Sequence, residues 1–182
     1  MADTIRETLA KLSTGLPTGI APSERLSTQP NDRKPAHFAI RIAPLSLDEV
    51  YSLVDNPANG AVVLMSGMVR NNTEGSAVVA LEYQAYEPMA LQVFQKIAVD
   101  IQTTWSDVTS MVIHHRVGRL AVGEISVLVA VGSPHRSEAF AACKYAIDTL
   151  KHNAPIWKKE HWADGSTSWV SIGACEQSDV NC

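Results

Sequence analysis

The chain has 182 residues, of which 46% are hydrophobic and 19% charged, and its formal net charge is −4. This length and composition predict one globular domain with a sizeable core, and the acidic balance argues against general affinity for nucleic acid or anionic membranes. The three cysteines do not have the spacing of a disulfide framework or a zinc site, which favours a reducing cytoplasm. The sequence shows no secretory signal and no apolar run of about 20 residues, so we expect a cytoplasmic protein without membrane spans.

Residues 1–36 are predicted to form a flexible N-terminal arm. Ser, Thr, Pro and Gly are frequent over residues 13–35, and such a composition buries little surface. Deleting the arm is expected to leave turnover and stability almost unchanged. The folded domain is predicted over residues 37–173, followed by a C-terminal tail over residues 174–182.

The folded part is predicted to begin with a strand and a short helix. Apolar and other residues alternate through HFAIRIAP (37–44), as expected for a strand. Ser46 and Glu49 then form the pattern of a capping box in front of a helical apolar repeat. Turn residues close this helix near Asn56.

Two β-rich runs follow, over residues 61–69 and 77–86. A polar turn separates them, so they are predicted to pair as a hairpin or as strands joined by a longer loop. Gly67 interrupts the first run, which indicates a bulge or a close approach of another backbone.

The second half of the chain predicts two more helices and three more strands. Pro88 suits the first turn of a helix, whose apolar stripe is Leu91, Phe94, Ile97, Ala98, Ile101 and Trp105. Strands are predicted over residues 111–120 and 124–132, and the second is apolar enough to lie in the middle of a sheet.

The last helix is expected to start after Ser133-Pro134 and to stop at Ala154-Pro155. Its predicted buried face is Phe140, Cys143, Ile147 and Leu150. A final strand is predicted over residues 166–173. The resulting order of strands and helices is that of an α+β fold with helices against one sheet.

The segment GSPHRSEAF (132–140) joins a predicted strand to the last helix. Such a turn presents backbone N–H groups at the positive end of the helix dipole, and His135 and Arg136 add two cationic donors. These features can form a phosphate or carboxylate site. On its own, however, the motif favours a solvated helix start, because it lacks a glycine-rich cradle.

Lys151 and Lys158 flank the proline turn after this helix. On a helical wheel Lys151 lies about 40° from Ile147, at the edge of the buried stripe, where its amine can face a cleft. The alternative is that it only complements the C-terminal helix dipole. If Pro155 turns the chain and Trp157 supplies an apolar wall, Lys158 converges with Lys151, and the two amines suit acid–base chemistry.

Other polar residues are weaker candidates. Lys159 and Glu160 are expected to form an exposed pair. His114 and His115 are adjacent on a predicted strand, so they point to opposite faces and cannot share a metal ion. We expect no metal site and no cofactor. Arg70 is either a solvated side chain or an anion ligand, and its spacing alone does not decide.

Four motifs occur along the chain: GMVRN (67–71), IHHRVG (113–118), SPHRSEAF (133–140) and LKHNAPIWKKE (150–160). In this order and spacing they resemble the large, catalytic subunit of molybdopterin synthase, over roughly residues 37–170. The lysine–proline–tryptophan–lysine element is specific to that family. The resemblance implies an α/β hammerhead-like fold, with a mixed, mostly antiparallel sheet and helices packed against it.

The resemblance also implies a sulfurtransferase in molybdenum cofactor biosynthesis. A small ubiquitin-like subunit with a C-terminal Gly-Gly thiocarboxylate would supply sulfur, and cyclic pyranopterin monophosphate would become the molybdopterin dithiolene. Because the dithiolene contains two sulfur atoms, two thiocarboxylated partner tails would be used, one after the other. Members of the family have a homodimer core with one small subunit at each end, which gives a heterotetramer.

Carried over to this sequence, Lys151 and Lys158 match the two catalytic lysines of the family. The resemblance implies that Lys151 is the principal acid–base group and that Lys158 holds substrate and the anionic intermediate. Two other readings compete with an enzyme of this kind. One is a non-catalytic adaptor that binds a ubiquitin-like tail, and the other is an enzyme that forms a Schiff base on Lys151.

Further residues match the family's substrate site. Arg70, His135 and Arg136 match its pterin-phosphate pocket. Pro155 and Trp157 are expected to shape a wall and a channel for the partner's tail. Since the partner brings the sulfur, the resemblance requires no cysteine of this chain.

Overall fold

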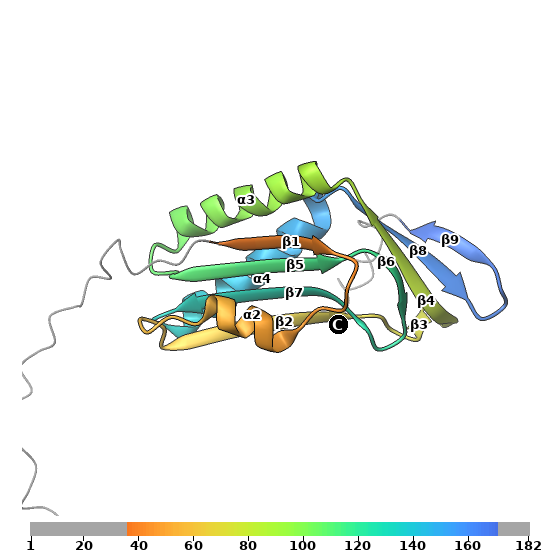
Figure 1. Ribbon diagram of the computed structural model, residues 1–182, viewed down its shortest axis with the longest axis horizontal. Helices are drawn as coiled ribbons and strands as arrows, with labels where there is room; N and C mark the ends of the chain where they lie inside the picture. Colours follow the sequence, from red (N-terminus) through yellow and green to blue (C-terminus); the bar gives the residue numbers. More distant parts are fainter. Residues whose placement is uncertain (1–35, 171–182) are drawn as a thin grey trace, which may run out of the picture.

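The computed structural model describes residues 36–170, in which three helices pack with two β-sheets (Figure 1). The predicted α+β class with mostly antiparallel pairing is confirmed. Nearly all of the predicted arm (1–36) and the whole tail (174–182) lie outside the described residues.

The first sheet has the strand order β1-β5-β7-β2. Its strands are β1 (His37–Arg41), β2 (Ala61–Met68), β5 (Ser110–Arg116) and β7 (Ile125–Ser133). Only β1 and β5 run parallel; the other neighbours are antiparallel. The apolar β7 is an inner strand, as its sequence predicts, because both faces of the sheet at this position are covered.

Helices cover both faces of this sheet (Figure 1). They are α2 (Leu47–Val54) on one face, and α3 (Glu87–Thr104) and α4 (Arg136–Asn153) on the other. The predicted cap of α2 is present, since Ser46 Oγ accepts a hydrogen bond from the Glu49 N–H at 3.2 Å. Glu49 does not complete a capping box; its carboxylate instead pairs with Arg41 at 2.6 Å.

The main core lies between α3, α4 and the sheet. Phe94, Ile97 and Ile101 of α3 are buried there, as predicted, and Phe94 meets Phe38 edge to face. The prediction for Phe140 is wrong, because this side chain is 63% exposed. The stripe that α4 buries is Ala139, Ala142, Cys143, Ala146, Ile147 and Leu150. Phe140 lies about 90° around the helix from its centre.

The second sheet has five strands and lies beyond one end of the first (Figure 1). Its strands are β3 (Asn72–Thr73), β4 (Ser76–Ala85), β6 (Gly118–Ala121), β8 (Ile156–Trp162) and β9 (Thr167–Val170). The strand β4 pairs with β3, β6 and β8, all antiparallel.

Three expectations about the strands are therefore wrong. The runs 61–69 and 77–86 do not pair, because β2 pairs with β7 in the first sheet and β4 with β8 in the second. The predicted strand 111–120 is two strands, since Gly118 at φ 92° redirects the chain into the second sheet. Residues 156–162, where no strand was predicted, form β8 in the second sheet, so the helices do not pack against one single sheet.

Candidate active site

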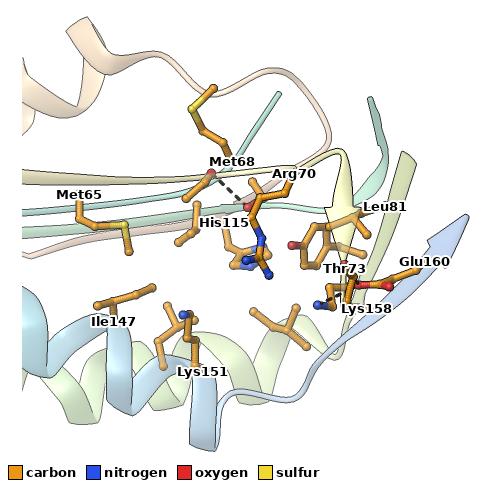
Figure 2. A pocket seen from close by; sticks show the side chains of 16 residues that line it. Met65, Met68, Arg70, Thr73, Leu81, His115, Ile147, Lys151, Lys158 and Glu160 are labelled. Atoms are coloured by element: carbon orange, nitrogen blue, oxygen red, sulfur yellow. Dashed lines mark hydrogen bonds and ion pairs between the residues drawn. The ribbon is translucent and has the colours of Figure 1, made fainter. Parts of the chain in front are cut away.

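A cavity of about 430 Å³ lies where the end of the first sheet, the C-terminal part of α4 and the second sheet meet (Figure 2). Side chains from β2, β4, β5, β7, α4 and β8 line it. Its apolar wall consists of Met65, Met68, Leu81, Val127, Ile147, Leu150 and Ile156. The cavity is thus built by segments that are far apart in the sequence.

Three cationic side chains enter this cavity from different elements: Arg70 just after β2, Lys151 in the last turn of α4 and Lys158 on β8. Figure 2 shows their charged ends directed into the space between the sheet and α4. Among the described lining residues only Glu160 carries a carboxylate. The excess of positive charge suits the cavity to an anionic ligand.

The strand β8 determines which of its lysines reaches the cavity. Side chains alternate along a strand, so Lys158 and Glu160 share one face and Lys159 lies on the other. Lys159 Nζ lies 5.7 Å from the ring centroid of Trp169. The expectation that Lys159 and Glu160 form an exposed pair is therefore wrong.

Glu160 is a site residue that sequence reasoning missed. Its side chain is 1% exposed, and its Oε1 lies 3.3 Å from Lys158 Nζ and accepts a 3.2 Å hydrogen bond from Thr73 Oγ1. Oε2 is buried without a hydrogen-bond partner. The signal that could have found this residue is the two-residue spacing from Lys158, once residues 156–162 are recognised as a strand.

Gly67 forms part of the cavity wall, and the expected irregularity is present. The register between β2 and β7 shifts at Gly67/Met68, which is the position of a bulge. A Cβ atom on Gly67 would lie 2.6 Å from Val127 Cγ1, so a side chain would not fit without movement. The bulge ends β2 and directs the chain toward Arg70.

His115 lines the cavity, whereas its neighbour His114 lies outside it. Burial lowers the pKa of His115 to about 4, against a weaker opposing effect of the hydrogen bond with the Arg116 carbonyl. Burial also lowers the pKa of His114, and the charge of Arg41 acts in the same direction. Both imidazoles are therefore neutral near pH 7.

The structure does not bring all predicted site residues together. His135 and Arg136 are exposed at the N-terminal end of α4 and do not line the cavity. Fifteen residues of helix separate Arg136 from Lys151, which corresponds to about 22 Å along the axis. Within one chain these two groups belong to separate surfaces.

Pro155 and Trp157 also lie outside the cavity lining. Pro155 follows the end of α4, and its carbonyl accepts a 3.0 Å hydrogen bond from the Tyr86 N–H. Trp157 is 50% exposed and borders a separate surface hollow with Gln84 and Trp169. Pro155 therefore positions β8, and Trp157 faces away from Lys158.

Cysteine and metal chemistry find no support in residues 36–170. Cys143 is buried, and burial raises the pKa of its thiol to about 11, which disfavours the nucleophilic thiolate. No group of three or more His, Cys, Asp or Glu side chains in this part of the chain is arranged to hold a metal ion. None of its helices is long and apolar enough to cross a membrane.

Comparisons with known proteins agree with this geometry. The family described as MoaE protein matches residues 40–153. A molybdopterin synthase catalytic subunit from Nostoc sp. is 74% identical over 145 residues, which are 80% of this chain and 88% of that protein. The protein of the same name from Homo sapiens is 48% identical over 131 residues, covering 72% of this chain and 69% of its own length.

Solved structures give the same result. The crystal structure of molybdopterin synthase from Staphylococcus aureus matches with a TM-score of 0.69 and 40% sequence identity, over 72% of this chain and 94% of that one. The family match includes Arg70 and Lys151 of the cavity and ends before β8. The sequence, the fold and the relatives all lead to one assignment: this chain belongs to the MoaE protein family.

Proposed function

We propose that this chain is the catalytic subunit of a molybdopterin synthase. It transfers sulfur from the C-terminal thiocarboxylate of a small ubiquitin-like subunit to cyclic pyranopterin monophosphate, which becomes the molybdopterin dithiolene. The observation that carries the proposal is the convergence of Arg70, Lys151 and Lys158 on one cavity. Membership of a family whose relatives are named molybdopterin synthase catalytic subunits supports it.

The proposed reaction needs charge stabilisation and proton transfer from this chain. The thiocarboxylate sulfur bonds to a substrate carbon, and a carbon–oxygen bond of that carbon breaks, its oxygen leaving on the phosphate or as water. A water molecule then cleaves the acyl–sulfur bond, leaving sulfur on the substrate and a carboxylate on the tail. A second charged tail repeats these steps. Anionic sulfur and oxygen atoms develop in both, and ammonium groups stabilise them best in a partly enclosed site.

The two lysines have different surroundings, which fits different roles. Lys151 is exposed at the rim of the cavity, so its amine can exchange protons with solvent, and we assign it as the principal acid–base group. Lys158 is 15% exposed and paired with Glu160, which suits holding substrate and the anionic intermediate in place. Arg70 is proposed to bind the substrate's phosphate.

His135 and Arg136 can serve the same site only if another copy of the chain supplies them. They lie about 22 Å along α4 from Lys151 within one chain. We therefore propose a homodimer in which each copy contributes these cations to its partner's cavity, with a small subunit at each end of the assembly. Trp157 also lies outside the cavity of its own chain. If it contacts the small subunit's tail or the substrate, it does so on the surface of the chain.

Reconstitution tests the proposed function. The chain is mixed with a thiocarboxylated small subunit and cyclic pyranopterin monophosphate, and dithiolene product is measured. Lys151→Ala should lower the turnover at least about 100-fold. Lys144→Ala is the matched control, since Lys144 lies on the same helix, is 80% exposed and pairs with Asp148 in the next turn.

The alternative of a non-catalytic adaptor predicts a different result. An adaptor would bind the small subunit and yield no dithiolene with any variant. Normal turnover of a folded Lys151→Ala chain would instead show that the reaction is as proposed and that the assignment of Lys151 is wrong.

A further inference from the structure

The cavity contains one neutral nitrogen that the proposed chemistry does not use, on His115. This residue lies on β5, is 4% exposed and lines the cavity. Figure 2 shows it on the sheet side of the cavity, across from Lys151 on α4. Its ring meets the Tyr83 ring edge to face, with centroids 5.1 Å apart and planes at 72°, which fixes the orientation of the imidazole.

The hydrogen bonds of His115 determine its tautomer. Nδ1 lies 2.8 Å from the backbone carbonyl oxygen of Arg116. A carbonyl oxygen only accepts, so Nδ1 carries the proton and donates it. Because the buried ring is neutral near pH 7, Nε2 has no proton and presents a lone pair.

Nε2 is accessible from the cavity. Within residues 36–170 it has no hydrogen-bond partner. Nδ1 of His114 also has no partner and is buried from solvent, but Nε2 of His115 is not among the atoms buried in this way. Since the cavity is the space that this side chain borders, Nε2 is reached from there.

Among the nitrogen-bearing side chains that line the cavity in the described part of the chain, His115 alone offers an acceptor. The lining also has the hydroxyls of Thr73, Tyr83 and Ser126, of which Thr73 and Ser126 already donate to Glu160 and to the Gly67 carbonyl. Arg70, Lys151 and Lys158 are donors only. Of the Glu160 oxygens, one is bonded to Thr73 and Lys158 and the other is sealed. A ligand that carries both an anionic group and N–H or O–H donors can therefore place its anion on the cations and one of its donors on Nε2 of His115.

We propose that His115 is a substrate-positioning residue whose Nε2 accepts a hydrogen bond from an N–H or O–H group of the pterin substrate, while the cations bind the substrate's anionic groups. This inference rests on the proposed function, since a pterin ring system carries such donors. It adds a selection step: an anion without a correctly placed donor binds to the cations and leaves Nε2 unpaired.

Two amide substitutions separate this role from a structural one. In His115→Asn the amide lies near the position of Nδ1, so it keeps a donor for the Arg116 carbonyl and loses the acceptor. In His115→Gln the amide reaches the position of Nε2 and can keep the acceptor. We expect His115→Asn to raise the KM for the pterin about 5- to 10-fold and His115→Gln to stay within about 3-fold of wild type.

The KM for the small subunit is the internal control and should change in neither variant. The opposite order, with Asn active and Gln impaired, would mean that only the Arg116 hydrogen bond matters and would overturn the proposal. Unchanged KM values in both variants would overturn it as well. Wild-type chain that forms no dithiolene would instead refute the proposed function, and this inference with it.

A measurement on the unaltered protein does not depend on how the variants fold. With ¹⁵N-labelled histidine, His115 should show an unprotonated Nε2 signal at pH 7 that moves toward the protonated range when cyclic pyranopterin monophosphate is added. A protonated Nε2 without ligand, or a signal that does not respond to a saturating ligand, would overturn the assignment.

Discussion

Lys158 Nζ lies 3.3 Å from Glu160 Oε1, and the two residues stand on the same face of β8. The Glu160 side chain is 1% exposed and the Lys158 side chain 15% exposed, so the pair is largely withdrawn from water. Such a pair contributes little net stability compared with apolar residues, but it fixes the position of each partner. We interpret Glu160 as the group that holds Lys158 toward the cavity.

Glu160→Gln should therefore lower activity more than stability. The amide keeps a hydrogen-bonding group near Thr73 but removes the charge that holds Lys158. We expect turnover to fall about 10-fold or more, and the free energy of unfolding to fall by about 1–3 kcal/mol, because Lys158 retains access to solvent. Urea denaturation and dithiolene formation measure the two effects. Glu82→Gln, on the opposite face of the neighbouring strand, should leave turnover unchanged.

Gly67→Ala should disturb both the fold and the cavity. The new methyl group would lie 2.6 Å from Val127 Cγ1, and Val127 is a stiff β-branched residue with 6% exposure. We expect a loss of about 1–3 kcal/mol in the free energy of unfolding, together with reduced turnover as the bulge before Arg70 shifts. The exposed neighbour provides the comparison: Ser66→Ala should behave as wild type, and equal stability of both variants would contradict the close contact.

The stability of the protein should fall in mild acid because of its buried histidines. The pKa of His115 is lowered to about 4 in the folded state, so below its ordinary value the unfolded chain binds more protons. The stabilisation is complete above about pH 6.5 and is lost as the pH falls. At pH 4 the loss amounts to about 3 kcal/mol. His114, whose pKa is also lowered, contributes in the same direction.

Denaturation curves between pH 4 and 7 test this dependence. The free energy of unfolding should rise with pH across that window in wild type and rise less steeply in His115→Gln. A slope that His115→Gln leaves unaltered would assign the effect to other groups, and would contradict a neutral, buried His115.

A mixing experiment tests whether one site uses two copies of the chain. Lys151→Ala and Arg136→Ala chains should each be nearly inactive alone. After unfolding and refolding together, half of the dimers contain one of each, and one of their two sites is intact, so about a quarter of wild-type activity should return. If mixing restores nothing, Lys151 and Arg136 do not act in one shared site.

Local features of this fold could be predicted from the sequence, whereas strand pairing could not. The Ser46 cap, Pro88 in the first turn of α3 and the irregularity at Gly67 depend on neighbouring residues, and all three are present. The partner of a strand depends on distant segments. The runs 61–69 and 77–86 looked like a hairpin because a short polar turn joins them, yet each pairs elsewhere.

The cavity illustrates the same limit. The convergence of Lys151 and Lys158 was predicted, and both line it. Glu160 was missed because no strand was predicted over residues 156–162, and it is the alternation of side chains along this strand that places Glu160 beside Lys158. Phe140 was predicted to be buried because only the large hydrophobic residues of α4 were considered. The buried face instead includes small residues such as Ala142 and Ala146, which let α4 approach the sheet.

The register of β8 against β4 also determines which of the two adjacent lysines, Lys158 or Lys159, faces the cavity. Tyr83 stands opposite Lys158, and Glu82 opposite Lys159. A slip of this pairing by one residue would turn Lys159 inward and carry both Lys158 and Glu160 to the solvent side. The sequence would be unchanged, but Lys158 and Glu160 would no longer face the cavity. A one-residue insertion or deletion in the turn around Pro155 should thus be more damaging than most substitutions within the strand.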